Sequence, residues 1–238
     1  MLGKNKTRDK EWDTPRSLQV QDIWYTIQGE GPSAGVPSFF IRMTGCNLKC
    51  YYCDTNWDDE KDPYIHILDI FCTLDKLKEK YPNVKLIVIT GGEPTRQNLT
   101  ELIEGFIHRG FTIEIETAGT FWQECFRAPE VHLIVSPKND YVHSAISTNV
   151  TVWKYVVSVN GYKPEAIREG LPTINPQRDG GNGNLYQPPY GNVAPIYISP
   201  CDEGLAEKNA NRRLALDIVL SSQKYRLSIQ MHKIVGAK

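Results

Sequence analysis

The chain has 238 residues, with 27 Lys and Arg against 28 Asp and Glu, a formal net charge of −1 and 40% apolar positions. This composition is typical of one ordinary domain, and a chain of this length buries enough surface to need no disulfide or structural metal for its core. The near-zero charge excludes the long-range field on which non-specific nucleic-acid binders depend, so we expect a small-molecule ligand and no direct nucleic-acid partner. The six cysteines need another explanation.

No apolar run approaches the roughly 20 residues that span a bilayer, and the polar, mixed-charge start of the chain lacks the apolar region of a signal peptide. We expect a cytoplasmic protein without a membrane partner, in which thiols stay reduced and clustered cysteines indicate a metal site. Residues 1–16 are expected to be a flexible or peripheral arm, and residues 17–238 to be one domain.

The apolar pattern predicts strands that alternate with helices. Helical spacing occurs between Pro63 and Pro82, and again at 99–107, where Gly110 is expected to end the helix. Continuous apolar runs predict buried strands. In chain order, the predicted strands lie at 18–27, 39–43, 86–90, 111–116, 131–136, 153–158, 194–199 and 226–230.

This alternation indicates a parallel βα architecture with too few units for eight full repeats. We therefore predict an α/β fold, a partial (open) parallel βα barrel. Functional residues of such folds lie where strands end, and polar clusters follow the predicted strands here: QGEG, TGGEP, ETAG, SPK, SPCDE and QMHK. Residues 175–192, rich in Gly, Asn and Pro, interrupt the pattern and are expected to form a surface insertion or lid.

The cysteines divide into two groups. Three lie in the run CNLKCYYC, with spacing Cys-x3-Cys-x2-Cys: Cys46, Cys50 and Cys53. Three close thiolates suit a 4Fe–4S cluster with one iron left open, whereas a closed zinc site takes four ligands and would need His66 or Asp54 as the fourth. The other three are expected to be small buried residues: Cys72, Cys125 and Cys201.

The cysteine run follows a core strand, and TGGEP at 90–94 follows the strand LIVI. This combination resembles the radical S-adenosylmethionine (SAM) superfamily. The resemblance implies a 4Fe–4S cluster with SAM bound at the open iron and a Gly-Gly-Glu motif that engages the methionine amino group. One electron then cleaves SAM to a 5′-deoxyadenosyl radical that abstracts a substrate hydrogen, so no catalytic side chain is expected beyond that radical.

Within this superfamily, the chain from about residue 18 onward is similar to the 7-carboxy-7-deazaguanine synthase family. The similarity is carried by TIQGEGPSAGVPSFFIRMTGCNLKCYYCDT, ITGGEPT, IETAGT, SPK, PCDE and YRLSIQMHKIVG. It implies a lyase that converts 6-carboxy-5,6,7,8-tetrahydropterin to 7-carboxy-7-deazaguanine with loss of ammonia, in 7-deazapurine (queuosine-type) biosynthesis. It also implies Mg²⁺, an electron donor such as flavodoxin or ferredoxin, and a homodimer.

The residues support this interpretation independently. Arg42 is the only charge in the strand FFIRM, and a buried guanidinium needs a partner, for which a ligand carboxylate is the best geometric match. A salt bridge to Glu114 or Glu116 is the structural alternative. Gln28 and Glu30 lie in a Gly-rich loop and suit the amide and amine edge of a heterocycle, with a plain turn as the alternative.

The resemblance assigns a role to each position that matches a family motif. Thr55 is implied as a hydroxyl ligand of Mg²⁺, although a Thr after Cys-Asp is ordinarily a turn or cap residue. The residues implied to bind SAM are Tyr52, Cys53, Asp54, Gly92, Glu93, Ser136, Pro137 and Lys138. The residues implied to bind the substrate are Ile27, Gln28, Gly29, Glu30, Arg42, Thr90, His232 and Lys238.

Without the family resemblance, we would expect Lys138 to be a solvated lysine and His232 to be a structural histidine. The chain also departs from the family pattern at four positions in the predicted pocket: Ala118, Ser199, Cys201 and Met231. These substitutions affect individual SAM and substrate contacts and leave the cysteines and Arg42 in place.

Two other functions were considered. A glycyl-radical-enzyme activating enzyme shares the short chain and the cysteine spacing, but it needs a partner-binding groove and no anion pocket, so Arg42, QGEG and QMHK argue against it. A non-enzymatic protein that keeps the cluster for docking is expected to lack Thr55, Glu93 or Arg42, and all three are present.

Overall fold

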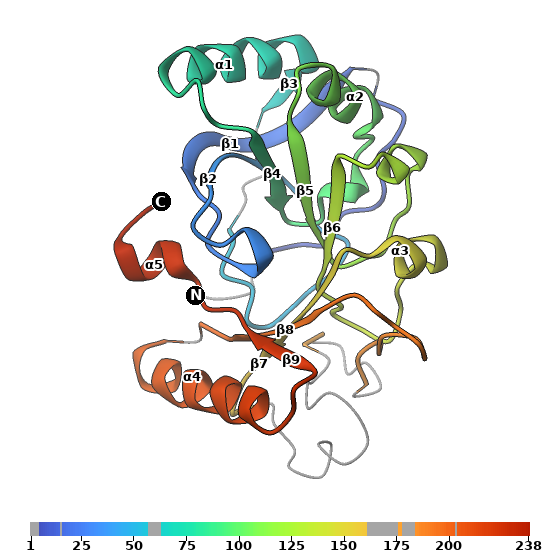
Figure 1. Ribbon diagram of the computed structural model, residues 1–238. Coiled ribbons are helices and arrows are strands. Elements are labelled where there is room, and N and C mark those ends of the chain that lie inside the picture. The colour runs from blue at the N-terminus through green and yellow to red at the C-terminus, as the bar shows by residue number, and fades with distance from the viewer. Residues whose placement is uncertain (1–4, 15, 57–62, 161–175, 178–183, 203) are drawn as a thin grey trace.

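The computed structural model describes residues 5–14, 16–56, 63–160, 176–177, 184–202 and 204–238 (Figure 1). Its centre is one nine-stranded sheet in the order β3-β1-β2-β4-β5-β6-β7-β8-β9. The strands are β1 (Ser17–Ile27), β2 (Pro37–Met43), β3 (Tyr64–His66), β4 (Leu86–Gly91), β5 (Thr112–Thr117), β6 (Val131–Val135), β7 (Val152–Val157), β8 (Ile196–Pro200) and β9 (Tyr225–Leu227). The helices are α1 (Ile67–Lys80), α2 (Thr100–His108), α3 (Ser144–Asn149), α4 (Leu205–Leu220) and α5 (Met231–Val235), with short 3-10 turns at Gly31–Ser33, Pro94–Arg96 and Glu124–Arg127.

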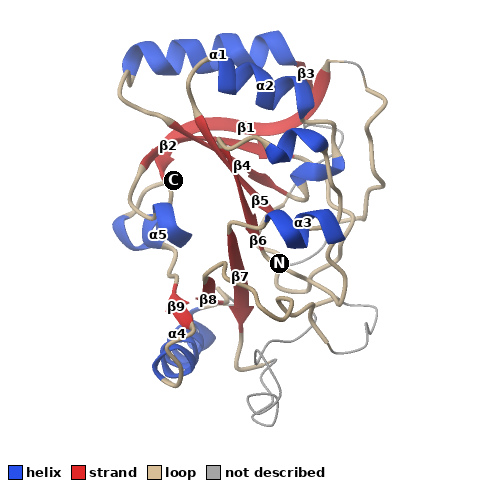
Figure 2. Cartoon of the chain, turned by 45° about the vertical axis from the view of Figure 1, so that its right-hand side comes forward, coloured by secondary structure: helices blue, strands red, loops and turns tan. Residues whose placement is uncertain are grey.

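The sheet is parallel from β2 through β4 to β9, and it does not close. In Figure 2 the strands follow an arc from β3 and β1 at the top to β8 and β9 at the bottom, with α5 between the two ends of the arc. The prediction of a partial, open parallel barrel is confirmed. Among the described residues, none of the helices combines the length and the apolar character needed to cross a bilayer.

The first strand differs from the rest. β1 pairs antiparallel with both β2 and β3. The segment between β1 and β2 has too few residues for the crossover that joins parallel strands, which takes about a dozen or more, so the chain folds back as a hairpin. The helical spacing after Pro63 likewise begins later than predicted, because residues 64–66 form the short strand β3.

Side chains that alternate along each strand build two different surfaces. The outer surface is apolar: Phe39 and Ile41 of β2, like Ile87 and Ile89 of β4, are fully buried in the main core beneath the helices. α1 and α2 cover this surface through the face that repeats every three to four residues. The main core therefore lies between the sheet and its outer helices.

The inner surface holds a small apolar cluster and then polar side chains. Phe40, Leu86 and Val88 pack together with Trp24 on this side. One step further along the same strands, Arg42 of β2 lies in register with Thr90 of β4. The inner surface thus becomes polar toward the carboxyl ends of the strands, where parallel barrels place functional residues.

Residues 5–14 of the predicted arm contact the body of the protein. The backbone N–H of Arg8 donates to the Cys46 carbonyl at 2.8 Å, and that of Glu11 donates to the Arg96 carbonyl at 2.8 Å. The Arg96 side chain is buried, and its guanidinium binds Glu11 at 2.9 Å and the Thr44 carbonyl at 3.2 Å. This stretch is peripheral, as expected, but it is tied to the loops that follow β2 and β4.

Parts of two predicted segments lie outside the described residues: 1–4 and 15 of the arm, and 175 and 178–183 of the insertion. The division into an arm over 1–16 and a domain over 17–238 stays a prediction. At the other end of the chain, residues 231–235, expected to be a loop, form the short helix α5.

Replacing Glu11 with Gln is expected to destabilise the protein by about 1–3 kcal/mol, because the buried Arg96 guanidinium then loses its charged partner. The matched control is Glu124→Gln, which removes an exposed ion pair with Arg127 and is expected to change the free energy of unfolding little. Urea denaturation of the anaerobic, cluster-loaded protein measures both. Equal losses in the two variants would contradict the role of the Glu11 contact.

Candidate active site

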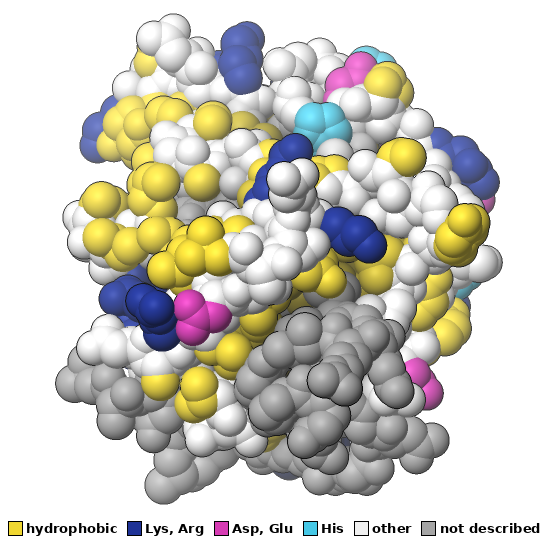
Figure 3. Space-filling view, turned by 60° about the horizontal axis from the view of Figure 1, so that its bottom comes forward, with side chains coloured by type: hydrophobic (Ala, Val, Ile, Leu, Met, Phe, Trp, Pro, Cys, Tyr) yellow, Lys and Arg dark blue, Asp and Glu magenta, His cyan; other side chains and the backbone are white. Residues whose placement is uncertain are grey.

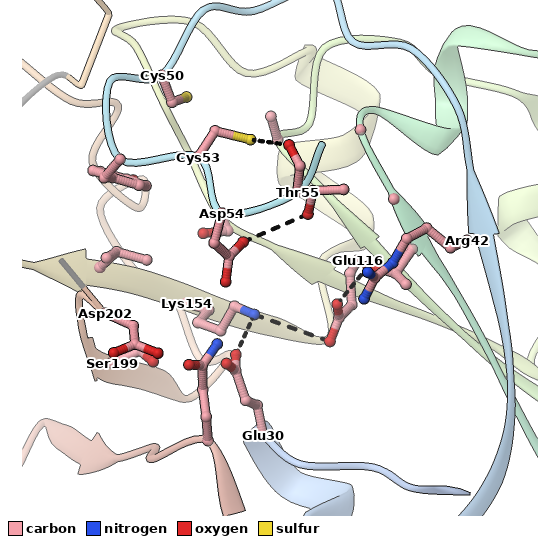
Figure 4. A pocket seen from close by; sticks show the side chains of 18 of the residues that line it. Glu30, Arg42, Cys50, Cys53, Asp54, Thr55, Glu116, Lys154, Ser199 and Asp202 are labelled. Carbon is pink, nitrogen blue, oxygen red and sulfur yellow. Dashed lines mark hydrogen bonds and ion pairs between the residues drawn. The ribbon is translucent and has the colours of Figure 1, made fainter. Parts of the chain in front are cut away.

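The polar ends of the strands surround one cavity of about 630 Å³. Figure 4 shows Cys50 and Cys53 toward one end of it, Glu30, Lys154, Glu116 and Arg42 toward the other, and Asp54 and Thr55 between them. Of the predicted site residues, those that line the cavity are Ile27, Gln28, Glu30, Arg42, Cys46, Cys50, Tyr52, Cys53, Asp54, Thr55, Thr90, Gly92, Glu93, Ser136, Lys138, His232 and Lys238. Gly29 and Pro137 are not among the lining residues, although their neighbours in the chain are.

The loop after β4 is joined to the cysteine loop through backbone contacts. The N–H of Gly92 donates to Met43 O at 3.2 Å, and that of Glu93 donates to Gly45 O at 2.9 Å. A Cβ on Gly92 would lie 2.1 Å from Gly45 O, and one on Gly91 would lie 2.1 Å from Met43 O. The two glycines are therefore required for the backbones to approach this closely.

The three cysteines of the run CNLKCYYC are free and partly buried. Burial raises the pKa of the thiols of Cys46, Cys50 and Cys53, so metal binding must release their protons. Within the described residues, no three His, Cys, Asp or Glu side chains converge closely enough to hold a single ion. A cubane binds its thiolates at separate irons, so three cysteines around one cavity fit a 4Fe–4S cluster better than one zinc ion, whose sulfur ligands lie about 2.3 Å away.

His66, the alternative zinc ligand, does not line the cavity. Its Nδ1 accepts from the backbone N–H of Leu68 at 3.2 Å and caps α1.

The three cysteines outside the run CNLKCYYC are not all buried, contrary to the prediction. Cys201 is buried as expected and Cys125 is only partly buried. Cys72 is exposed, because it lies one position beyond Phe71 and hence about a quarter turn away from the buried face of α1.

The Glu93 carboxylate is buried and held by its own chain. Its Oε1 accepts from the hydroxyls of Thr95 and Thr117, both at 2.6 Å, and its Oε2 accepts from the N–H of Ala118 at 2.7 Å. Burial raises the pKa of Glu93, against the effect of these hydrogen bonds. The carboxylate is fixed in place, and Oε2 keeps one lone pair for a ligand. Ala118, one of the departures from the family pattern, contributes here through its backbone.

Arg42 points into the cavity, and no acidic side chain among the described residues pairs with it. Its guanidinium lies 5.1 Å from the ring of Trp24, and its Nε is buried with no hydrogen-bond partner among the described residues. The salt bridge to Glu114 or Glu116 is not formed. Glu114 instead accepts from Gln28 at 2.8 Å, and Glu116 accepts from Thr90 at 2.8 Å. This partly buried guanidinium, with its Nε shielded from solvent, is suited to bind an anionic ligand.

Lys154 of β7 is a site residue that the sequence analysis missed. Its Nζ lies 2.5 Å from Glu30 Oε2 and 4.0 Å from Glu116 Oε1, and its side chain is largely buried. Burial raises the pKa of Glu30, but attraction to Lys154 and hydrogen bonds from Lys154 and Gln230 outweigh it, so the pKa lies below its usual value. The pKa of Lys154 lies above its usual value because the two carboxylates outweigh burial. Glu30 and Lys154 therefore each stabilise the charged form of the other.

The signal that could have found Lys154 and Glu116 is their position in the strands. Lys154 occupies an inward-facing position between the buried, apolar Trp153 and Tyr155, and Glu116 follows the buried Ile115. A charge at every second place of an otherwise apolar strand indicates a polar interior.

The loop after β1 is shaped by close contacts. The Gln28 carboxamide donates to Glu114 Oε2 at 2.8 Å and accepts from the N–H of Glu30 at 3.2 Å, so its orientation is set by the protein. Gly29 accepts from the N–H of Met231 at 3.0 Å, and a Cβ on Gly29 would lie 1.8 Å from Nδ1 of His232. Gly29 therefore leaves the space that the imidazole occupies.

The C-terminal segment forms one wall of the cavity. Burial lowers the pKa of His232, which favours the neutral imidazole. The next residue, Lys233, forms salt bridges through its Nζ to Asp54 Oδ2 at 3.1 Å and to Asp202 Oδ2 at 2.9 Å. Thr26 Oγ1 donates to the Lys238 carbonyl at 2.8 Å. These contacts connect α5 and the residues after it to both the first strand and the cysteine loop.

The turn after β6 carries Ser136 and Lys138. Lys138 Nζ donates to the Ser136 carbonyl at 2.8 Å and also contacts its hydroxyl. Burial lowers the pKa of Lys138, while the nearby Cys50 opposes that shift. Lys138 is therefore a partly buried lysine held beside the cysteine loop and not the solvated lysine that the residue type alone suggests.

Thr55 lies at the edge of the cysteine loop, two residues after Cys53. Its hydroxyl is 3.5 Å from Asp54 Oδ1, and its carbonyl accepts from the Asn5 carboxamide at 2.7 Å. The two oxygen groups, hydroxyl and carboxylate, are the ligand type that Mg²⁺ prefers.

Two more positions depart from the family pattern. Ser199 lines the cavity, whereas the backbone N–H of Met231 contacts the Gly29 carbonyl.

Replacing Lys154 with Met is expected to destabilise the protein by about 3–5 kcal/mol at pH 8, because two carboxylates then face each other without a buried cation. The loss should be smaller at pH 5. In the wild type, the lowered pKa of Glu30 gives stability that is present above its unfolded pKa and lost as pH falls through the folded value. In the variant, burial raises that pKa, so the folded state keeps a proton that the unfolded state releases, and stability falls as pH rises.

Urea denaturation at the two pH values measures this dependence. The double variant Lys154→Met with Glu30→Gln is the control, since it removes the carboxyl that titrates. It should recover stability at pH 8 and lose most of the added pH dependence. The same loss at both pH values in the single variant would contradict the charge argument.

Comparisons with known proteins agree with this geometry. The radical SAM superfamily model matches residues 40–136, which contain both the cysteine loop and the Gly-Gly-Glu loop. The 7-carboxy-7-deazaguanine synthase of Rhodospirillum rubrum is 33% identical over 245 residues, covering 99% of each chain, and that of Rickettsia prowazekii is 33% identical over 248 residues, covering 99% of this chain and 95% of the relative. The crystal structure of QueE from Escherichia coli has the same fold, with a TM-score of 0.67, 24% identity and coverage of 93% of this chain and 97% of the other. The chain belongs to the 7-carboxy-7-deazaguanine synthase family of radical SAM enzymes.

Proposed function

We propose that this chain converts 6-carboxy-5,6,7,8-tetrahydropterin to 7-carboxy-7-deazaguanine and ammonia, as a radical SAM lyase of 7-deazapurine biosynthesis. The observation that carries the proposal is Arg42, a partly buried guanidinium without an acidic partner among the described residues, in the same cavity as the three cysteines. The curated relatives that cover the whole chain bear the name of this activity. Product and ammonia together contain all atoms of the substrate, so the reaction needs no net oxidant.

The cysteine end of the cavity is proposed to hold the cofactors. Cys46, Cys50 and Cys53 would bind the 4Fe–4S cluster, which together with SAM would supply the radical chemistry for removing a hydrogen atom from the substrate. The fixed Glu93 carboxylate and the backbone of Gly92 receive the methionine amino group. The other residues proposed for SAM are Tyr52, Asp54, Ser136, Pro137 and Lys138.

The opposite end of the cavity is proposed to hold the pterin. Arg42 binds the substrate carboxylate through parallel N–H donors, which neutral side chains cannot replace. Glu30 and Gln28 read the polar edge of the heterocycle, and Lys154 keeps Glu30 ionised as a hydrogen-bond acceptor. The other residues proposed for the substrate are Ile27, Gly29, Thr90, His232 and Lys238.

The glycyl-radical-enzyme activating function is not favoured, because the relatives that match across the chain are 7-carboxy-7-deazaguanine synthases. The cavity also suits a small anion, with Arg42 at its polar end.

Two partners remain proposals. A homodimer is expected from the resemblance, and sedimentation velocity of the cluster-loaded protein tests it.

The second proposed partner is a one-electron donor of the flavodoxin or ferredoxin type, which must reach the cluster. The face in Figure 3 presents Lys and Arg side chains among apolar ones and few acidic ones, which suits a negatively charged carrier. A cytoplasmic location, where thiols stay reduced, fits the same proposal.

The decisive assay uses the anaerobically reconstituted enzyme with dithionite, SAM, Mg²⁺ and the carboxytetrahydropterin. We expect 7-carboxy-7-deazaguanine and ammonia in equal amounts by mass spectrometry and ammonia determination. Arg42→Gln should raise KM for the pterin about 10- to 100-fold, because charge-assisted hydrogen bonds to the carboxylate are lost. Formation of 5′-deoxyadenosine alone, without either product, would refute the lyase assignment.

Thr55→Ala is expected to remove the stimulation of turnover by Mg²⁺, because the hydroxyl ligand is lost. Iron content and the visible spectrum of the cluster should stay at wild-type values. Thr73→Ala is the matched control, since the Thr73 hydroxyl binds the Asp69 carbonyl on α1, away from the cavity. A Thr55→Ala enzyme that still responds fully to Mg²⁺ would exclude Thr55 as the ligand.

A further inference from the structure

Residues 176 and 177 lie beside the cysteine loop, although they belong to the segment expected to be an insertion. Gln177 forms an isolated antiparallel bridge with Cys50, and the N–H of Tyr51 donates to the Pro176 carbonyl at 3.0 Å. These backbone contacts bring a distant part of the chain, 127 positions beyond Cys50, against the middle of the run CNLKCYYC.

The Gln177 side chain connects three groups around the cluster cysteines. Its Nε2 lies 3.2 Å from Cys50 Sγ and 3.1 Å from the Lys138 carbonyl, while its Oε1 accepts from the N–H of Lys49 at 2.9 Å. Reversing the carboxamide would place its oxygen against a carbonyl and its nitrogen against an N–H. The neighbours therefore fix its orientation, with an N–H directed at the sulfur.

We propose that Gln177 is a positioning residue that holds the Cys50 thiolate and raises the reduction potential of the cluster. A ligating cysteine carries negative charge, and the reduced cluster carries one electron more than the oxidised one. An N–H donor at the sulfur therefore stabilises the reduced state more than the oxidised state. The electron comes from an external one-electron donor, and no bond at Gln177 forms or breaks.

The inference gives residues 176–177 a function beyond covering the surface. It deepens the proposed function and rests on it in one respect, that Cys50 ligates the cluster. Lys138 also lies near Cys50, but it is present in every variant below. Differences between the variants therefore report on the Gln177 side chain.

The test is an anaerobic potentiometric titration of the reconstituted protein, followed by electron paramagnetic resonance, without SAM or pterin. In Gln177→Leu, which has no donor, the equilibrium constant for reduction should fall about 2- to 10-fold, as expected for the loss of one hydrogen bond. Each factor of ten corresponds to about 59 mV for one electron. Gln177→Glu keeps the acceptor for Lys49 but places a carboxylate at the sulfur, so its potential should fall further.

Gln187→Leu is the matched control, because the Gln187 carboxamide donates to the Leu185 carbonyl in the same segment of the chain. Its potential should equal that of the wild type. Iron content is measured for every variant. An unchanged potential in Gln177→Leu with full iron content would overturn the proposal, and if that variant does not retain iron, an unchanged potential in Gln177→Glu would do so.

Loss of the cluster from both Gln177 variants would also overturn the tuning role and leave only a structural connection. The outcome is separable from the proposed function. The potential is measured without substrate, so a chain that makes no deazaguanine can still show the shift, and an unshifted chain can still be an active lyase.

Discussion

The structure depends on the two-residue alternation of side chains along its parallel strands. Outward positions are apolar and pack against the helices, while inward positions near the carboxyl ends are charged or hydroxylated. Because the sheet curves without closing, these inward side chains meet across one cavity. Arg42, Glu116 and Lys154 come from three different strands, yet the curvature brings them together in Figure 4.

A second constraint is the approach of two backbones behind the cysteines. The loop after β4 donates two N–H groups to the loop after β2, and neither Gly91 nor Gly92 has room for a side chain. The conformation of the cysteine loop is therefore set partly by the Gly-Gly-Glu motif. In physical terms, the cysteine loop and the Gly-Gly-Glu loop are one structural unit.

Much of this arrangement could be predicted from the sequence. The positions of the parallel strands predicted the fold class, and the cysteine spacing and the polar loops that follow the strands predicted where the site lies, whereas most of the individual residues that line the cavity were assigned through the resemblance to a known family. These signals are local, since they depend on spacing within a few residues. The antiparallel direction of β1 was missed, although the shortness of the following loop already indicates a hairpin.

The remaining features depend on contacts between distant residues. Lys154 was missed because its strand was interpreted only as an apolar run, and its importance comes from Glu30, which is 124 positions away. Gln177 lies in a segment whose composition indicates only a loop. The sequence also could not predict that Arg42 forms no salt bridge with Glu114 or Glu116. Both carboxylates are suitable partners by position, but they accept hydrogen bonds from Gln28 and Thr90 instead.

The contacts between the two ends of the described chain bear on the order of folding. The Gly29 carbonyl accepts from Met231, and Thr26 binds Lys238, so the cavity wall joins segments synthesised at opposite times. During translation, the cysteine loop emerges long before residues 230–238. Until residues 230–238 dock, the cavity that the cysteines line therefore lacks one of its walls. Insertion of the cluster before that moment would protect the cysteines, while insertion afterwards must proceed through a nearly finished cavity.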